Sequence, residues 1–254
     1  MKIIYSKHFE VKYPTNPVEN SDRVRFPAKE LQEAGYEFIE PLPALLEDIR
    51  RVHGLQHINI VRARGLYDAA ALAAGGAICA AELAIQGEPA FGLVRPPGHH
   101  AAANRAWGMC FFNNMAIAVQ RIRPKAKRVL IIDIDLHFGD GTVSIFRGDE
   151  NVKIVNPWSV DADFEYLNMD ASGYLKQVEN AFSGFDFDIV GVSAGFDTYV
   201  EDWGGLLRTE DYREIGRIIR LGSMRCGGRR FAVLEGGYHQ DLRHNVVSFI
   251  EGFE

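Results

Sequence analysis

The sequence predicts a single α/β domain, residues 1–254, with a mostly parallel sheet covered by helices on both faces. Apolar runs of strand length alternate with segments of helical spacing along the whole chain, which is the pattern of strands joined by helical crossovers. The runs are apolar at consecutive positions, as expected of parallel strands buried on both faces. No internal repeat or linker divides the 254 residues, of which 47% are hydrophobic, so one large domain is expected.

Six apolar segments have the length and composition of strands. Turn-forming residues follow three of them directly: Pro96 and Pro97, then Gly195, and then Gly236. The predicted strands are residues 1–5, 91–94, 129–132, 151–155, 188–194 and 230–235.

Seven segments have helical spacing or composition between these strands. The longest is rich in Ala and Gly and can therefore pack closely on a sheet, and another begins at Thr209 and repeats Ile215, Ile218 and Ile219 on one face. The predicted helices are residues 31–36, 43–52, 66–86, 111–123, 171–182, 209–222 and 241–253. Residues 9–29 are polar and contain three prolines, so we expect them to form a surface loop.

The composition excludes several classes of protein. The formal net charge of −6 argues against a nucleic-acid-binding protein, which needs a basic face. The three cysteines are far apart in the sequence, so we expect no disulfide framework and a reducing, cytoplasmic environment. We expect no signal peptide and no membrane span, because the amino terminus has no long apolar segment and Glu82 interrupts the longest apolar helix.

The segment IIDIDLHFGDGT, residues 131–142, is the strongest indication of a functional site. The strand before it should deliver Asp133, Asp135 and His137 in steps of two, so that their polar groups point the same way. Two carboxylates and an imidazole at the carboxyl end of a parallel strand are typical of a metal site. The alternative is an Asp-rich turn from strand to loop, in which the carboxylates only cap the backbone.

Polar residues also follow three other predicted strands. If all strands are parallel, these strand ends share one edge of the sheet with the central segment. The residues are His99 and His100, Asp197, and Tyr238.

The two histidines suit proton transfer near neutral pH, and a carboxylate partner would fix the tautomer of each ring. Asp133 and Asp140 are the candidate partners. Alternatively, His99 and His100 are one buried structural histidine beside one exposed one.

Asp197 and Tyr238 complete the candidate site. Asp197 is a natural third metal ligand, or else a cap of the turn after its strand. Tyr238 follows two glycines, which permit a close approach of the backbone to a ligand, and its phenol could donate to an oxyanion. The alternative for Tyr238 is a core aromatic.

Five motifs, in order along the chain, resemble the zinc-dependent histone deacetylase family. The carboxyl-terminal motifs are most similar to its acetylpolyamine amidohydrolase and class II-like prokaryotic branch. The motifs are RPPGHHA (95–101), GMCFFNN (108–114), DIDLHFGDGT (133–142), SAGFDTYVED (193–202) and EGGYH (235–239).

The resemblance implies the arginase-deacetylase fold, with a sheet of about eight strands, and a zinc ion. It implies a potassium ion near the backbone carbonyls of residues 133–137, and an acyl tunnel beside Gly108 and Met109. It also implies a role for each remaining site residue. Asp135, His137 and Asp197 would be zinc ligands. His99 would pair with Asp133 and His100 with Asp140, and His100 would transfer the proton. Tyr238 would stabilise the oxyanion.

Four departures from the family pattern concern the substrate tunnel and the potassium site. Met109 stands where the family has an aromatic wall, and Asn156-Pro157-Trp158 replaces the usual Ser-x-His. The loop that often carries a substrate-gripping Asp is nearly absent between Ile60 and Asp68. A further tunnel segment has no clear equivalent, although Phe164 and Tyr166 are candidates for its aromatic residues.

The expected function is hydrolysis of an N-acetylated amine, either a small amine or polyamine or acetyl-lysine. A dimetal ureohydrolase of the same fold is an alternative, but it would need a bridging Asp two residues after Asp197, where Tyr199 stands. A non-catalytic protein that binds acylated amines is the other alternative. Loss of Tyr238 or of the pair His99 and His100 would favour this non-catalytic alternative, and all three residues are present.

Overall fold

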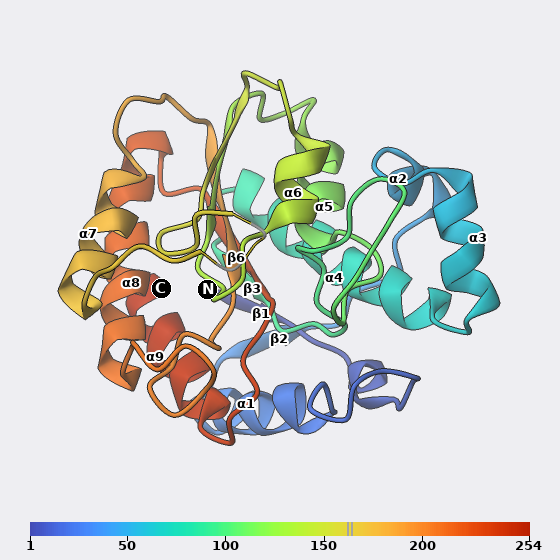
Figure 1. Cartoon of the computed structure of the whole chain (residues 1–254), viewed down its shortest axis with the longest axis horizontal. Helices are drawn as coiled ribbons and strands as arrows, with labels where there is room; N and C mark the ends of the chain where they lie inside the picture. The colour runs from blue at the N-terminus through green and yellow to red at the C-terminus, as the bar shows by residue number, and fades with distance from the viewer. Residues whose placement is uncertain (162, 164) are drawn as a thin grey trace.

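A seven-stranded sheet, parallel throughout, forms the centre of the computed structural model, which describes residues 1–161, 163 and 165–254 (Figure 1). The α/β class and the parallel sheet are confirmed, although the described residues form seven strands and not eight. The order across the sheet is β2-β1-β3-β7-β6-β4-β5. The strands are β1 (Lys2–Ile4), β2 (Glu37–Ile39), β3 (Ala90–Gly92), β4 (Val129–Asp133), β5 (Val152–Val155), β6 (Ile189–Ala194) and β7 (Arg230–Leu234).

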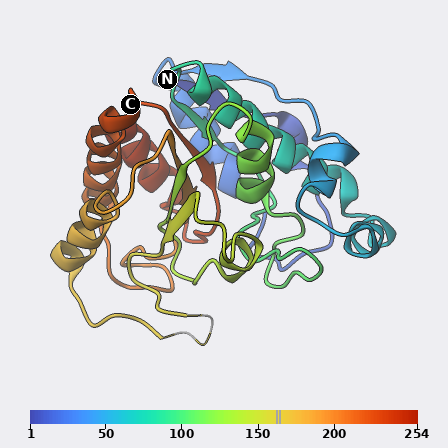
Figure 2. The same ribbon diagram turned by 90° about the horizontal axis from the view of Figure 1, so that it is seen from above.

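Helices cover both faces of the sheet. Figures 1 and 2 show α4 and α5 on one side and α7, α8 and α9 gathered on the other. Helix α1 packs against α9. The helices are α1 (Asp22–Glu33), α2 (Leu46–Arg50), α3 (Leu55–Ala63), α4 (Tyr67–Ile85), α5 (Asn114–Ile122), α6 (Asp140–Ile145), α7 (Ala171–Asn180), α8 (Thr209–Ser223) and α9 (Leu242–Phe253).

Helix α4 is the long helix that its small residues predicted. By length and composition alone it could cross a membrane, but 67% of its apolar window is buried inside the fold. A Cβ atom at Gly76 would lie 2.5 Å from Cγ1 of Val94, and one at Gly75 would lie 1.9 Å from the Leu42 carbonyl oxygen. The glycines therefore let the helix approach its neighbours closely, as a core helix does.

The prediction that residues 9–29 form a surface loop was wrong over its second half. Helix α1 begins at Asp22 and contains Pro27. Its face of Val24, Ala28 and Leu31 is buried, so tertiary packing outweighs the backbone hydrogen bond that proline removes. This helix brings Arg23 into the interior of the protein.

Two other local predictions were wrong. The helix expected over residues 31–36 is only the end of α1, because the chain turns at Gly35, whose φ is 85°, and enters β2. Helix α3 was not predicted, since its apolar face is short. It ends at Ala63, only a few residues before α4 begins at Tyr67, so the connection is as short as the sequence indicated.

The chain after the central strand also differs from the expectation. Strand β4 ends at Asp133, and the next residues bend before α6 begins at Asp140. Asp133, Asp135 and His137 therefore do not alternate along one strand. Asp133 is bonded to Nδ1 of His99, whereas Asp135 lies 3.2 Å from Nδ1 of His137 and 3.6 Å from Nε2 of His99.

Candidate active site

The candidate site lies above four adjacent strands, β3, β7, β6 and β4, at their carboxyl ends. The loops that follow these strands carry the predicted polar residues, and parallel strands bring their ends to the same edge of the sheet. A cavity of about 230 Å³ opens there. Its lining residues are Asn16, Pro97, His99, His100, Trp107, Gly108, Met109, Cys110, His137, Trp203, Gly236 and Tyr238.

Asp135, His137 and Asp197 form one cluster, of which His137 lines this cavity. One ligand atom from each lies within 4.8 Å of the others. Nδ1 of His137 is 3.2 Å from Oδ1 of Asp135 and 3.0 Å from Oδ2 of Asp197. Backbone N–H groups also bind both carboxylates: that of Gly236 donates to Asp135, and that of Leu136 donates to Asp197.

The donor set of this cluster fits a zinc ion. Oδ2 of Asp197 is buried and lies 3.0 Å from Nδ1 of His137, and a buried carboxylate is costly unless a positive charge or a cation meets it. Burial by itself lowers the pKa of His137, but contacts with Asp135 and Asp197 outweigh it and raise the pKa to about 10. While no cation is bound, a proton on Nδ1 of His137 would lie between these carboxylates.

Two histidine–carboxylate pairs lie beside the cluster. Nδ1 of His99 is 3.1 Å from Oδ2 of Asp133, and Nδ1 of His100 is 2.7 Å from Oδ1 of Asp140. Burial and the neighbouring charge of His99 lower the pKa of His100 to about 4. Burial opposes a charge on His99, but Asp135 and Asp133 hold its pKa well above its ordinary value.

The two imidazoles therefore differ in charge at neutral pH. His100 is neutral and can accept a proton, whereas His99 is cationic in the metal-free site. This difference follows from the surroundings of each ring, because His99 contacts more buried carboxylate than His100 does.

Tyr238 lines the cavity, and two side chains contact its ring. The Trp203 ring stacks on it with centroids 4.4 Å apart, and the Arg23 guanidinium lies 4.8 Å from its centroid. Its backbone N–H donates to Oδ2 of Asp202 over 2.6 Å. Burial raises the pKa of Tyr238 well above the ordinary value although Arg23 opposes this shift, so the phenol keeps its proton.

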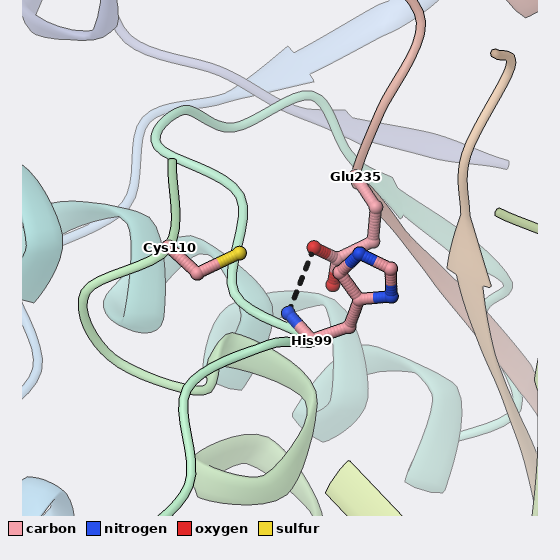
Figure 3. Close-up of side chains that lie close together, drawn as sticks. All are labelled: His99, Cys110 and Glu235. Carbon is pink, nitrogen blue, oxygen red and sulfur yellow. Dashed lines mark hydrogen bonds between the residues drawn. The ribbon is translucent and has the colours of Figure 1, made fainter. Parts of the chain in front are cut away.

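Glu235 fixes the backbone under the His pair. Its Oε2 accepts the N–H groups of Gly98 and His99, over 2.6 and 3.1 Å. Figure 3 shows the bond to His99 and the sulfur of Cys110 pointing toward the same carboxylate. Burial raises the pKa of Glu235 to about 7, although the charge of His99 opposes the shift.

The predicted tunnel residues fall partly at the site. Gly108 and Met109 both line the cavity. The Tyr166 ring packs against Trp158, with ring centroids 4.9 Å apart. Burial and the negative charge of Asp197 both raise the pKa of Tyr166, as expected for a phenol near the cluster. Phe164 lies outside the described residues.

Sequence reasoning missed three side chains that contact the predicted site residues. Trp107 packs against His100, Trp203 stacks on Tyr238, and Arg23 donates to the Gly237 carbonyl over 2.7 Å. The two tryptophans stand next to motif residues, at positions 107 and 203, and that adjacency was a usable signal. No comparable sequence signal pointed to Arg23, because its segment was predicted to be a surface loop.

Comparison with known proteins agrees with the motifs. The family model "Histone deacetylase domain" matches residues 17–166. A probable deacetylase of Methanothermobacter thermautotrophicus is 31% identical over the whole chain and 91% of its own length. Acetylpolyamine amidohydrolase 2 of Pseudomonas aeruginosa is 34% identical over 68% of this chain and 58% of its own. The crystal structure of the HDA15 HD domain superposes with a TM-score of 0.86 at 25% identity, covering 99% of this chain and 88% of that one.

Proposed function

The chain belongs to the histone deacetylase family, and from this premise we propose that it is a zinc-dependent deacetylase that hydrolyses an N-acetylated amine to acetate and the free amine. One observation carries the proposal. The Asp135–His137–Asp197 cluster, the His100–Asp140 pair and Tyr238 meet around a single cavity. Metal-assisted amide hydrolysis needs a metal site, a proton acceptor and an oxyanion donor in this arrangement.

Asp135, His137 and Asp197 would hold the zinc ion. When bound, zinc would supply a Lewis acid that polarises the amide carbonyl and lowers the pKa of a water molecule to about 7. Three protein ligands leave a coordination position open, as catalytic zinc sites require.

His100 would transfer the protons. As a neutral imidazole it accepts a proton from the attacking water, while the water oxygen forms its bond to the carbonyl carbon. The same proton then passes to the amine nitrogen as the carbon–nitrogen bond breaks, so that the amine leaves neutral. Asp140, on Nδ1, keeps the other ring nitrogen of His100 facing the cavity.

Tyr238 and His99 would stabilise the charge that develops during this reaction. The phenol of Tyr238 keeps its proton at neutral pH and can donate it in a hydrogen bond to the carbonyl oxygen as that oxygen becomes negative. His99, paired with the fully buried Asp133, would act through its electric field.

We propose a small acetylated amine, such as a polyamine, as the substrate in preference to acetyl-lysine within a protein. The short connection between α3 and α4 supports this, because the family's substrate-gripping loop has no room there. Without a grip on its backbone, a peptide loses conformational freedom with little compensating hydrogen bonding. One relative, from Pseudomonas aeruginosa, is named as an acetylpolyamine amidohydrolase.

The test is a screen of acylated amines and peptides with zinc-loaded protein. We expect hydrolysis of an acetylated diamine or polyamine with a higher kcat/KM than that of an acetyl-lysine peptide. A peptide preference of about tenfold, equivalent to about 1.4 kcal/mol of transition-state binding, would favour the protein-deacetylase alternative. Hydrolysis of neither class would contradict the deacetylase proposal itself.

A further inference from the structure

Trp107 makes two contacts with the proton-transfer pair that no motif predicted. Its Nε1 lies 3.1 Å from both carboxylate oxygens of Asp140. Its ring packs against that of His100 in a tilted arrangement, with centroids 3.9 Å apart and an angle of 34° between the planes. One side chain therefore contacts both members of the pair, and it also lines the cavity.

The backbone beside Trp107 follows the same ring closely. Gly108 has a φ of 62°, and a Cβ atom there would lie 3.3 Å from Cδ2 of His100. A side chain at residue 108 would be strained by this φ and would also press on the imidazole. The backbone of this loop therefore packs against His100 as well, so the contact does not depend on the Trp107 side chain alone.

The two histidine pairs differ in how their carboxylates are held. Asp133 is fully buried, and its Oδ1 accepts the backbone N–H of Asp135 over 3.2 Å. Asp140 stands at the start of the short helix α6, and the bonds to its carboxylate come from the side chains of His100 and Trp107. The indole N–H of Trp107 is therefore the second hydrogen-bond donor to Asp140, as the backbone N–H of Asp135 is to Asp133.

We infer that Trp107 is a positioning residue for proton transfer, acting through Asp140 on His100. This inference rests on the proposed deacetylase function. A carboxylate with a single donor can rotate, whereas two donors from different directions fix its plane and hence the imidazole bonded to it. Reaction rates fall steeply when a reacting group is displaced even slightly. The indole ring also packs on one face of the His100 imidazole and restricts its side-chain rotation.

A double-mutant cycle separates this role from a purely structural one. Trp107→Phe keeps an aromatic ring and removes the N–H group. We expect kcat to fall about tenfold with KM changed by less than about twofold, the size of effect expected for one hydrogen bond to a charged group. In an Asp140→Ala background the same substitution should leave kcat unchanged, because the group through which Trp107 acts is gone.

Two kinetic results would overturn the inference. An equal fall in kcat in the Asp140→Ala background would show that Trp107 acts independently of the pair. A rise in KM with kcat unchanged would make Trp107 only a wall of the substrate cavity. Trp158→Phe is the matched control, since the Trp158 indole donates to the Leu167 carbonyl over 2.8 Å and not to Asp140.

A nuclear magnetic resonance experiment tests the inference without any activity. The side-chain signals of His100, identified by their loss in His100→Ala, should shift in Trp107→Phe and remain in place in Trp158→Phe. Unchanged His100 signals in Trp107→Phe would overturn the inference. If the wild-type protein hydrolyses no acylated amine, the proposed function fails, and these signals still decide whether Trp107 positions His100.

Discussion

Nδ1 of His137 lies 3.0 Å from Oδ2 of Asp197, an oxygen that is fully buried. The contact joins the end of β4 to the end of β6, which are neighbours in the sheet. A cation between these atoms would satisfy the carboxylate, and this expectation leads to the first two predictions.

His137→Ala should abolish tight metal binding and activity together. Two carboxylates without the imidazole are a weak zinc site, because zinc favours nitrogen and sulfur ligands. Elemental analysis of the purified variant should find no zinc, against one ion per chain in the wild type. His8→Ala removes an exposed histidine and should retain the metal. Two tightly held ions in the wild type would favour the dimetal ureohydrolase alternative.

Metal binding should release a proton and strengthen as the pH rises. The pKa of His137 is about 10 in the metal-free site, so at neutral pH its proton must leave before a metal can bind. Between about pH 7 and 9, each unit of pH should raise the apparent affinity about tenfold, equivalent to about 1.4 kcal/mol. Calorimetry in buffers of different ionisation enthalpy measures the released proton. An affinity independent of pH over this range would contradict the prediction.

Tyr238→Phe should lower kcat by about 10²–10³, the typical effect of removing one oxyanion donor. The phenyl ring can keep its stacking on Trp203, so metal content should not change. Steady-state kinetics and elemental analysis on the same sample check both statements. Tyr36→Phe removes a phenol distant from the cavity and serves as the control. A variant as fast as the wild type would exclude Tyr238 from the reaction.

His100→Ala should reduce kcat/KM more than His99→Ala does. His100 is the neutral imidazole, with a pKa lowered to about 4, and general acid–base catalysis typically contributes about 10²–10⁴ in rate. His99 is paired with the fully buried Asp133 and is assigned an electrostatic role, not proton transfer. The ratio of the two rate losses is the measurement, with metal content checked in each variant. A larger loss in His99→Ala would reverse the assignment.

Glu235→Ala should destabilise the protein by about 1–3 kcal/mol, because the buried N–H groups of Gly98 and His99 would lose their acceptor. Glu235→Gln retains a carbonyl oxygen and should cost less. Denaturant unfolding of both variants measures the difference. Glu251→Ala, at an exposed side chain, should change stability by less than about 0.5 kcal/mol. Equal losses in Glu235→Ala and Glu235→Gln would show that the carboxylate does not act as the acceptor of these groups.

The sequence by itself determined the fold class and the place of the site. Consecutive apolar residues predicted buried parallel strands. Once the strands are parallel, the residues after β3, β4, β6 and β7 must meet at one edge of the sheet. This argument uses only local composition and the order of the elements along the chain, both of which can be read from the sequence.

The tertiary structure decided contacts within the site beyond the pairings of His99 with Asp133 and of His100 with Asp140 that the family resemblance implied. Periodicity aligned Asp133 with Asp135, and after the bend that follows β4 Asp133 contacts Nδ1 of His99, while Asp135 contacts both His137 and Nε2 of His99. Arg23 reaches the Gly237 carbonyl, 214 positions away in the chain, because the packing of α1 outweighs the effect of Pro27. Trp107 lies on His100 because Gly108 turns the loop back. The contact of Arg23 with Gly237 joins segments that only the packed core brings together. The contact of Trp107 with His100 depends on the path of the loop between them. Local sequence patterns carry no information about either.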